Sequence, residues 1–159
     1  MRLNTYRFRD SWFIAAPVAS VFDAVVDVAR YPQWWPDVRS VSRIDDDTAE
    51  LVCRATLPYR LVLRMSRAEE DAPSGRLRVH LGGDLEGSLA ALVVRQPTGT
   101  RLEITQQVVA TKPLLRRLSP MARPLFLVNH ALMMRRGQHG LSAFLTAGKP
   151  VPPGPPLFR

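Results

Sequence analysis

The most regular pattern in the chain lies near its end, in residues 119–145, where apolar residues recur every three or four positions. That spacing is the period of one face of an α-helix, and Arg135, Arg136 and His139 fall on the opposite side. The pattern predicts a long amphipathic helix, with His130 and Gly137 as unusual members of its apolar face. The face is formed by Phe126, His130, Met133, Gly137, Leu141 and Phe144, and Leu127, Met134 and Leu145 widen it.

Shorter segments of alternating apolar and polar residues precede this helix, and turn residues separate them. Residues 6–15 form the first predicted strand, and two short helices follow at residues 17–28 and 29–35. Asp10 falls on the apolar side of the first strand, where we expect either a bulge or chain end, or a polar group that reaches the interior. The remaining strands are predicted at residues 38–44, 50–57, 59–67, 76–81, 87–96 and 100–110.

Consecutive strands joined by short turns predict an antiparallel meander of about six or seven strands. Because each strand has one apolar and one charged face, the sheet needs a cover on one side only, and the long helix can provide it. The expected fold class is α+β, with a curved sheet wrapped around the C-terminal helix and a space between them. We assign residues 1–147 to this single domain, and the proline-rich residues 148–159 to a disordered or polyproline-like tail.

The net charge of +8 comes almost entirely from arginine. Such a charge suits nucleic acid or an anionic membrane surface, but it also follows from a genome that favours arginine codons. Most arginines are single residues on predicted strands, and no stacked aromatic residues accompany them, so we exclude nucleic acid as a partner. A transient contact with an anionic membrane surface stays open, as does the choice between a monomer and a homodimer.

Cys53 is the only cysteine, which excludes an internal disulfide bond and any metal site built from several cysteines. The N-terminus shows no secretory signal, and the longest apolar run, residues 89–94, is too short to span a bilayer. We therefore expect a cytoplasmic protein. The three histidines are predicted on different faces, so we expect no metal, and the paired glycines lack the residues of a phosphate-binding loop, so we expect no cofactor.

Several stretches of the sequence form a recognisable set. Residues 14–17 read Ile-Ala-Ala-Pro, and residues 27–36 read Asp-Val-Ala-Arg-Tyr-Pro-Gln-Trp-Trp-Pro. The set also includes residues 83–87, the turn at Gly99 and the predicted helix after Asn129. Over residues 6–145 the chain resembles the SRPBCC (START-like) superfamily, in the polyketide cyclase/dehydrase and lipid transport group. The resemblance implies a helix-grip fold with a deep apolar cavity between the sheet and the C-terminal helix. Members bind lipids, sterols, polyketides or hormones, and some are enzymes, so the resemblance leaves the activity open.

The resemblance also places Trp34 and Trp35 at the mouth of the cavity. On one helical turn their side chains would point about 100° apart, so that one packs inward while the other caps the opening. Gly137 either leaves volume for a ligand or lets the helix approach the sheet. The candidate ligand-binding residues are Trp34, Trp35, Tyr59, Met65, Gln106, Phe126, His130, Met133, Met134 and Gly137.

Cyclisation or dehydration of a carbonyl compound would require a positioned proton donor or acceptor in the cavity. The candidates are His130, Tyr59 and Glu86, and for each of them packing, a structural hydrogen bond or a turn is the alternative explanation. Clear polar groups on the inner faces are few. The sequence therefore favours binding or transport of a hydrophobic or aromatic small molecule or lipid, with a polyketide cyclase, aromatase or dehydratase as the alternative.

Overall fold

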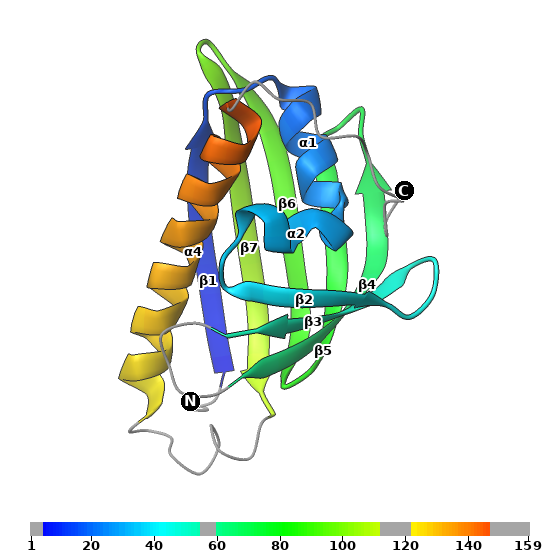
Figure 1. Cartoon of the computed structure of the whole chain (residues 1–159), viewed down its shortest axis with the longest axis vertical. Helices are drawn as coiled ribbons and strands as arrows, with labels where there is room; N and C mark the ends of the chain where they lie inside the picture. Colours follow the sequence, from blue (N-terminus) through cyan, green and yellow to red (C-terminus); the bar gives the residue numbers. More distant parts are fainter. Residues whose placement is uncertain (1–4, 55–59, 112–121, 147–159) are drawn as a thin grey trace.

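A computed structural model describes residues 5–54, 60–111 and 122–146 of the chain (Figure 1). The candidate Tyr59, the predicted start of the long helix at Ser119 and the tail at residues 148–159 lie outside the described residues. No helix within the described ranges is long and apolar enough to cross a membrane.

Seven antiparallel strands form a single sheet in the described part of the chain, in the order β1-β7-β6-β5-β4-β3-β2. The predicted meander is therefore confirmed, and β1 closes it by pairing with β7. Figure 1 shows β2 and β3 running across the direction of β1, β6 and β7, so the sheet curves strongly. The strands are β1 (Thr5–Ile14), β2 (Val38–Arg43), β3 (Thr48–Cys53), β4 (Leu61–Asp71), β5 (Arg76–Gly83), β6 (Leu85–Gln96) and β7 (Gly99–Ala110).

The helices follow the predicted order. Helix α1 (Val18–Val26), a 3₁₀ turn η1 (Val28–Arg30) and α2 (Tyr31–Trp34) come after β1, and α4 (Ala122–Thr146) ends the domain. Pro124 lies in the first turn of α4, where its missing N–H has no helical acceptor to lose. Figure 1 shows α4 beside β1, with α1 and α2 over the same face of the sheet.

Strand β1 contains no bulge at Asp10. Its register with β7 is continuous from Thr5 to Ile14, so the bulge expected from the sequence is wrong. Asp10 instead lies on the same side of β1 as Phe8 and Trp12, half-buried, and the loss of solvent raises the pKa of its carboxyl group. A polar group therefore does reach toward the covered side of the sheet.

Strand β4 is longer than its hydrophobic pattern indicates. It continues to Asp71, four residues past the predicted end, and residues 68–71 are exposed. Backbone pairing with β5 carries this part of the hairpin beyond the core, after a register shift between Arg67 and Glu69. Because no side chain is buried there, the sequence contains no alternation from which the extension could be predicted.

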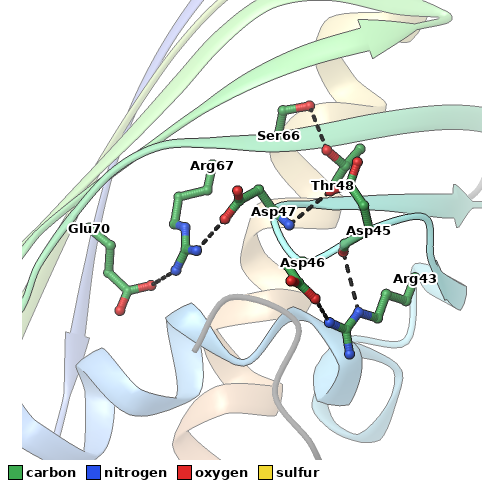
Figure 2. Close-up of polar contacts among 8 residues, drawn as sticks. All are labelled: Arg43, Asp45, Asp46, Asp47, Thr48, Ser66, Arg67 and Glu70. Carbon is green, nitrogen blue, oxygen red and sulfur yellow. Dashed lines mark hydrogen bonds and ion pairs between the residues drawn. The ribbon is translucent and has the colours of Figure 1, made fainter.

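A polar network holds the turn between β2 and β3 at the rim of the sheet (Figure 2). Asp45 accepts a hydrogen bond from the backbone N–H of Asp47 at 2.9 Å, which stabilises the turn. Arg67 of β4 bonds to both Asp47 and Glu70, and its backbone N–H donates to the carbonyl oxygen of Asp47 at 2.8 Å. The turn is thereby fastened to the adjacent strand.

The core lies between the inner face of the sheet and the three helices. It contains the inward residues of every strand together with Val21, Phe22 and Val26 of α1. Near the start of α4, the Phe126 ring packs on Tyr6 with ring centroids 4.4 Å apart. The Arg123 guanidinium lies over the Tyr6 ring, 4.8 Å from its centroid, and donates a hydrogen bond to the carbonyl oxygen of Thr5.

Candidate ligand-binding cavity

A cavity of about 100 Å³ lies between the curved sheet, α2 and α4. Its walls combine inward residues of β3, β4, β5, β6 and β7 with one face of α4, so residues far apart in sequence meet around one space. The lining residues are Trp12, Val25, Tyr31, Trp34, Trp35, Val38, Leu51, Cys53, Leu61, Leu63, Met65, Leu81, Leu85, Leu89, Ala91, Leu102, Ile104, Gln106, Phe126, Asn129, His130, Met133 and Met134.

Aromatic rings form one end of the cavity. Trp34 and Trp35 stack with centroids 5.4 Å apart and planes 17° from parallel, and Trp12 meets Trp35 edge-on at 5.6 Å. The sequence indicated tryptophans pointing in different directions, but Trp35 already has an extended backbone as the C-cap of α2. Leaving the helix at that residue brings the two rings face to face, and both line the cavity.

Two glycines of α4 make room for this aromatic end. A Cβ atom on Gly137 would lie 2.7 Å from both the Trp12 and Trp35 rings, and one on Gly140 would lie 1.6 Å from the backbone oxygen of Trp34. The absence of side chains therefore permits close approach of α2 to α4. Gly137 does not itself line the cavity, because the tryptophan rings fill the space beside it.

Polar contacts fix the same junction. The Trp35 indole N–H donates to the carbonyl oxygen of Met133 at 2.9 Å. Arg136 forms two hydrogen bonds with the carboxylate of Asp37, at 2.9 and 2.7 Å, and the Asp37 side chain is 1% exposed. The sequence pattern had placed Arg136 on the outer side of the helix. Arg136 lies instead at the flank of α4, where its long side chain reaches Asp37 in the segment after α2.

Polar groups occupy the opposite end of the cavity, near Phe126. The Nε2 atom of His130 and the Oε1 atom of Gln106 are 3.3 Å apart, which joins α4 to β7. The imidazole ring of His130 stacks on Phe8 with centroids 3.5 Å apart, and Phe8 is the β1 neighbour of Gln106. Both members of the pair are half-buried, and Asn129 beside them is buried.

Three lining residues could exchange a proton, and none has a pKa near neutrality. Burial lowers the pKa of His130 to about 4, so its imidazole is neutral at physiological pH. Burial raises the pKa of the Cys53 thiol to about 12, and the nearby Asp37 charge adds to this effect. Burial also raises the pKa of Tyr31, whose hydroxyl group donates to the carbonyl oxygen of Val25.

The structure brings together most of the residues predicted to contact a ligand. Eight of them line the cavity: Trp34, Trp35, Met65, Gln106, Phe126, His130, Met133 and Met134. Glu86 is exposed and does not line it, while Asp84 accepts a hydrogen bond from the backbone N–H of Val62 at 2.8 Å, as expected for a turn residue. Tyr59 lies outside the described residues.

Sequence reasoning missed Tyr31, Asn129 and the pair Asp37–Arg136. Asn129 directly precedes His130, and Tyr31 lies three residues before Trp34, but each was considered only as part of a family-like motif. Asp37 is 99 residues from Arg136, and no local pattern indicates such a pair. Among the described residues, no group of three or more histidine, cysteine, aspartate or glutamate side chains could hold a metal ion.

A family model described as "Polyketide cyclase / dehydrase and lipid transport" matches residues 14–115. The match covers β1's end, both short helices and the sheet that forms most of the cavity wall. The chain belongs to this family. A search of curated proteins found no match.

Several solved structures share the fold of this chain. The Zhui aromatase/cyclase of Streptomyces sp. R1128 is 13% identical, with 92% of this chain and 99% of that one covered and a TM-score of 0.75. Ara h 8.0201 is 11% identical, with 91% and 99% covered and a TM-score of 0.67. The di-domain aromatase/cyclase BexL of the BE-7585A biosynthetic pathway is 18% identical, with 94% and 52% covered and a TM-score of 0.72. These similarities confirm a helix-grip fold.

Proposed function

We propose that this family member binds a small hydrophobic or aromatic molecule in the cavity between the sheet and α4. The observation that carries the proposal is the composition of the wall. Of its 23 described residues, none is Asp, Glu, Lys or Arg, and the polar side chains Gln106, Asn129 and His130 sit at one end. An apolar enclosure with a few convergent polar groups is the usual form of a small-molecule site.

The size of the cavity limits what it holds without rearrangement. Its volume of about 100 Å³ is below the roughly 300–1,000 Å³ of pockets for drug-sized ligands, and an engineered cavity of roughly 150 Å³ holds benzene. The cavity in this form is therefore no larger than a single ring requires, and even a one-ring compound needs some movement of the wall. Met65, Met133 and Met134 are flexible wall residues, and a change of their rotamers would admit a longer molecule.

Catalysis of ring closure or dehydration is the second candidate, favoured by the position of His130 inside the cavity. The Zhui protein and BexL are named as aromatase/cyclases, which fits this alternative. A general base works best with a pKa near the operating pH, and the pKa of His130 is about 4. Binding is therefore the better-supported function.

The tryptophans provide a direct test of binding. The chain has three, Trp12, Trp34 and Trp35, and all of them line the cavity. Their indole N–H signals in an NMR spectrum therefore report on the cavity alone. Addition of ethylbenzene, a one-ring hydrocarbon, is expected to shift all three signals in a saturable way.

A cavity-filling variant supplies the control. Ala91 is buried in the wall, and its neighbour Ala90 lies on the outer face of the same strand. Ala91→Leu should occupy the cavity and weaken ethylbenzene binding at least about tenfold, because overpacking opposes insertion of the ligand. Ala90→Leu should bind as the parent protein does. Absence of any saturable shift, or equal binding by Ala91→Leu, would contradict the proposal.

Separate measurements distinguish the catalytic alternative. A linear poly-β-ketone compound would be incubated with the protein, and ring-closed product would be measured. If His130 transfers protons, His130→Gln loses turnover and keeps ethylbenzene binding. If the protein only binds, neither the parent nor the variant accelerates product formation above the rate in buffer.

A further inference from the structure

The contact between His130 and Gln106 determines which hydrogen-bond donors and acceptors remain at the polar end of the cavity. His130 Nε2 and Gln106 Oε1 are 3.3 Å apart. A neutral imidazole has one donor nitrogen and one acceptor nitrogen, and a glutamine amide has a donor NH₂ group and an acceptor oxygen. One donor and one acceptor are used in the contact between the two side chains.

Whichever way the contact is arranged, one side chain keeps a hydrogen-bond donor and the other keeps an acceptor. If the His130 Nε2–H donates to Gln106 Oε1, the Gln106 NH₂ group is left as a donor and His130 Nδ1 as an acceptor. If the amide is turned so that its NH₂ group donates to His130 Nε2, the amide oxygen is left as an acceptor and Nδ1–H as a donor. Either way, the pair retains at least one donor and at least one acceptor.

The strand neighbours of the pair are uncharged, and Asp10, which lies on the same side of β1 as Phe8, does not line the cavity. On β7, Gln106 lies between Phe8 of β1 and Leu89 of β6, and His130 stacks on Phe8. Among the described residues at this end of α4, the cation Arg123 lies over Tyr6 and bonds to the backbone of Thr5, outside the cavity wall. Burial also keeps His130 neutral, with a pKa of about 4. A carboxylate or phosphate entering here would lose water without meeting a charged partner among the lining residues.

We propose that Gln106 and His130 determine specificity, by selecting a neutral ligand whose ring carries a hydroxyl group. This inference rests on the proposed function of the cavity. A phenol or enol hydroxyl both donates and accepts a hydrogen bond, so it matches the donor and the acceptor that the pair retains. Fatty acids and other anionic lipids are disfavoured by the same geometry.

Three ligands of matched shape test the inference: 4-ethylphenol, ethylbenzene and 4-ethylbenzoate. Each is titrated into the full chain at neutral pH, and binding is followed by the three tryptophan indole signals. In the parent protein, 4-ethylphenol should bind at least as tightly as the more hydrophobic ethylbenzene. The anionic 4-ethylbenzoate should bind at least about tenfold more weakly than the phenol.

The decisive variant is Gln106→Leu, which keeps the volume of the side chain and removes its polar groups. It should weaken binding of 4-ethylphenol about tenfold and leave ethylbenzene binding unchanged or tighter, because a buried hydroxyl then lacks a partner. Gln107→Leu is the matched control, since Gln107 is the next residue on β7 and is exposed on the outer face. It should leave both affinities as they are.

The outcomes separate this inference from the proposed function. If no ligand shifts the indole signals of the parent protein, the proposed function fails and the inference falls with it. If the hydrocarbon binds but 4-ethylbenzoate equals or exceeds 4-ethylphenol, the function stands and the selection of a neutral hydroxyl is wrong. An unchanged ratio of phenol to hydrocarbon affinity in Gln106→Leu would likewise overturn it. His130→Leu should change the ratio in the same direction as Gln106→Leu.

Discussion

The two ends of the cavity are built in different ways. At the aromatic end, the rings stack, α2 and α4 come into close contact at Gly137 and Gly140, and the Asp37–Arg136 ion pair joins the same junction. At the polar end, His130 and Gln106 share one hydrogen bond, remain half-buried and keep unused donors and acceptors. The aromatic end therefore tolerates few substitutions, and its contacts hold α2 against α4. The polar end has spare hydrogen-bonding capacity and suits ligand recognition.

The largest effect is expected at the aromatic end from Gly140→Ala. The new Cβ atom would lie 1.6 Å from the Trp34 backbone oxygen, so α2 and α4 must separate. We expect the free energy of unfolding to fall by about 3 kcal/mol or more, despite the gain of about 1 kcal/mol from placing alanine in a helix. Chemical denaturation measures this loss.

Gly82→Ala is the matched control for that substitution. A Cβ atom on Gly82 would meet nothing within 4 Å. The free energy of unfolding of the Gly82→Ala variant should stay within about 0.5 kcal/mol of the parent value. Similar losses in the two variants would show that α2 and α4 are not in the close contact described.

A smaller loss is expected from Arg136→Met, which leaves the buried Asp37 carboxylate without its ion-pair partner. Because Arg136 is partly exposed, we expect a destabilisation of about 2–3 kcal/mol, at the lower limit for broken buried pairs. The double variant Asp37→Asn/Arg136→Met should recover part of it. Arg43→Met, which breaks the exposed pair with Asp46 seen in Figure 2, should cost less than about 1 kcal/mol. Equal costs would contradict the structural role of the Asp37–Arg136 pair.

The smallest expected effect is the loss of stability when His130, at the polar end of the cavity, is protonated. The pKa of His130 is about 4 in the folded protein against 6.5 in an exposed histidine. The unfolded chain therefore binds the proton first, so stability is retained above pH 6.5 and is lost as the pH falls toward 4. The full shift corresponds to at most about 3 kcal/mol. Because the imidazole is only half-buried, solvent screening lowers the expected loss to about 2 kcal/mol.

Comparison with His130→Gln isolates this contribution from the titration of carboxylates. The stability of the variant should decline less steeply between pH 6.5 and 4 than that of the parent. Denaturant unfolding at several pH values measures both slopes. Parallel curves would mean that His130 is not buried in its neutral form.

Periodicity made most of the fold predictable. Alternation and the turn residues between segments located the strands, although the apolar run of residues 87–96 hides its period. The three-and-four spacing around Phe126 and Leu141 located α4 and most of the face that it buries, but Leu127, predicted to widen that face, is 39% exposed. The extension of β4 to Asp71 was missed because backbone pairing continued where no side chain was buried. Of the two explanations left open for Asp10, the bulge was wrong and the inward polar group was right, because half-burial of one carboxyl group did not disturb a continuous register.

The candidate site was predictable to the extent that it consists of inward residues. The inward positions of strands and of α4 supplied Met65, Gln106, His130 and Met133. The pairing of Asp37 with Arg136 and the stacking of Trp34 on Trp35 depend on how distant segments meet. The role of Gly137 was left open by the sequence, because a missing side chain allows either ligand volume or close packing, and only the positions of the tryptophan rings decide between them.

The most direct test of the central claim is an NMR measurement of nuclear Overhauser effects between 4-ethylphenol and the methyl groups of the protein. The account predicts contacts to the methyl groups of Leu63, Met65 and Met134, which line the cavity. Contacts to Leu125 and Val128, both 59% exposed on α4, without contacts to the cavity methyl groups, would contradict it. Absence of any contact at a saturating concentration of 4-ethylphenol would contradict it equally.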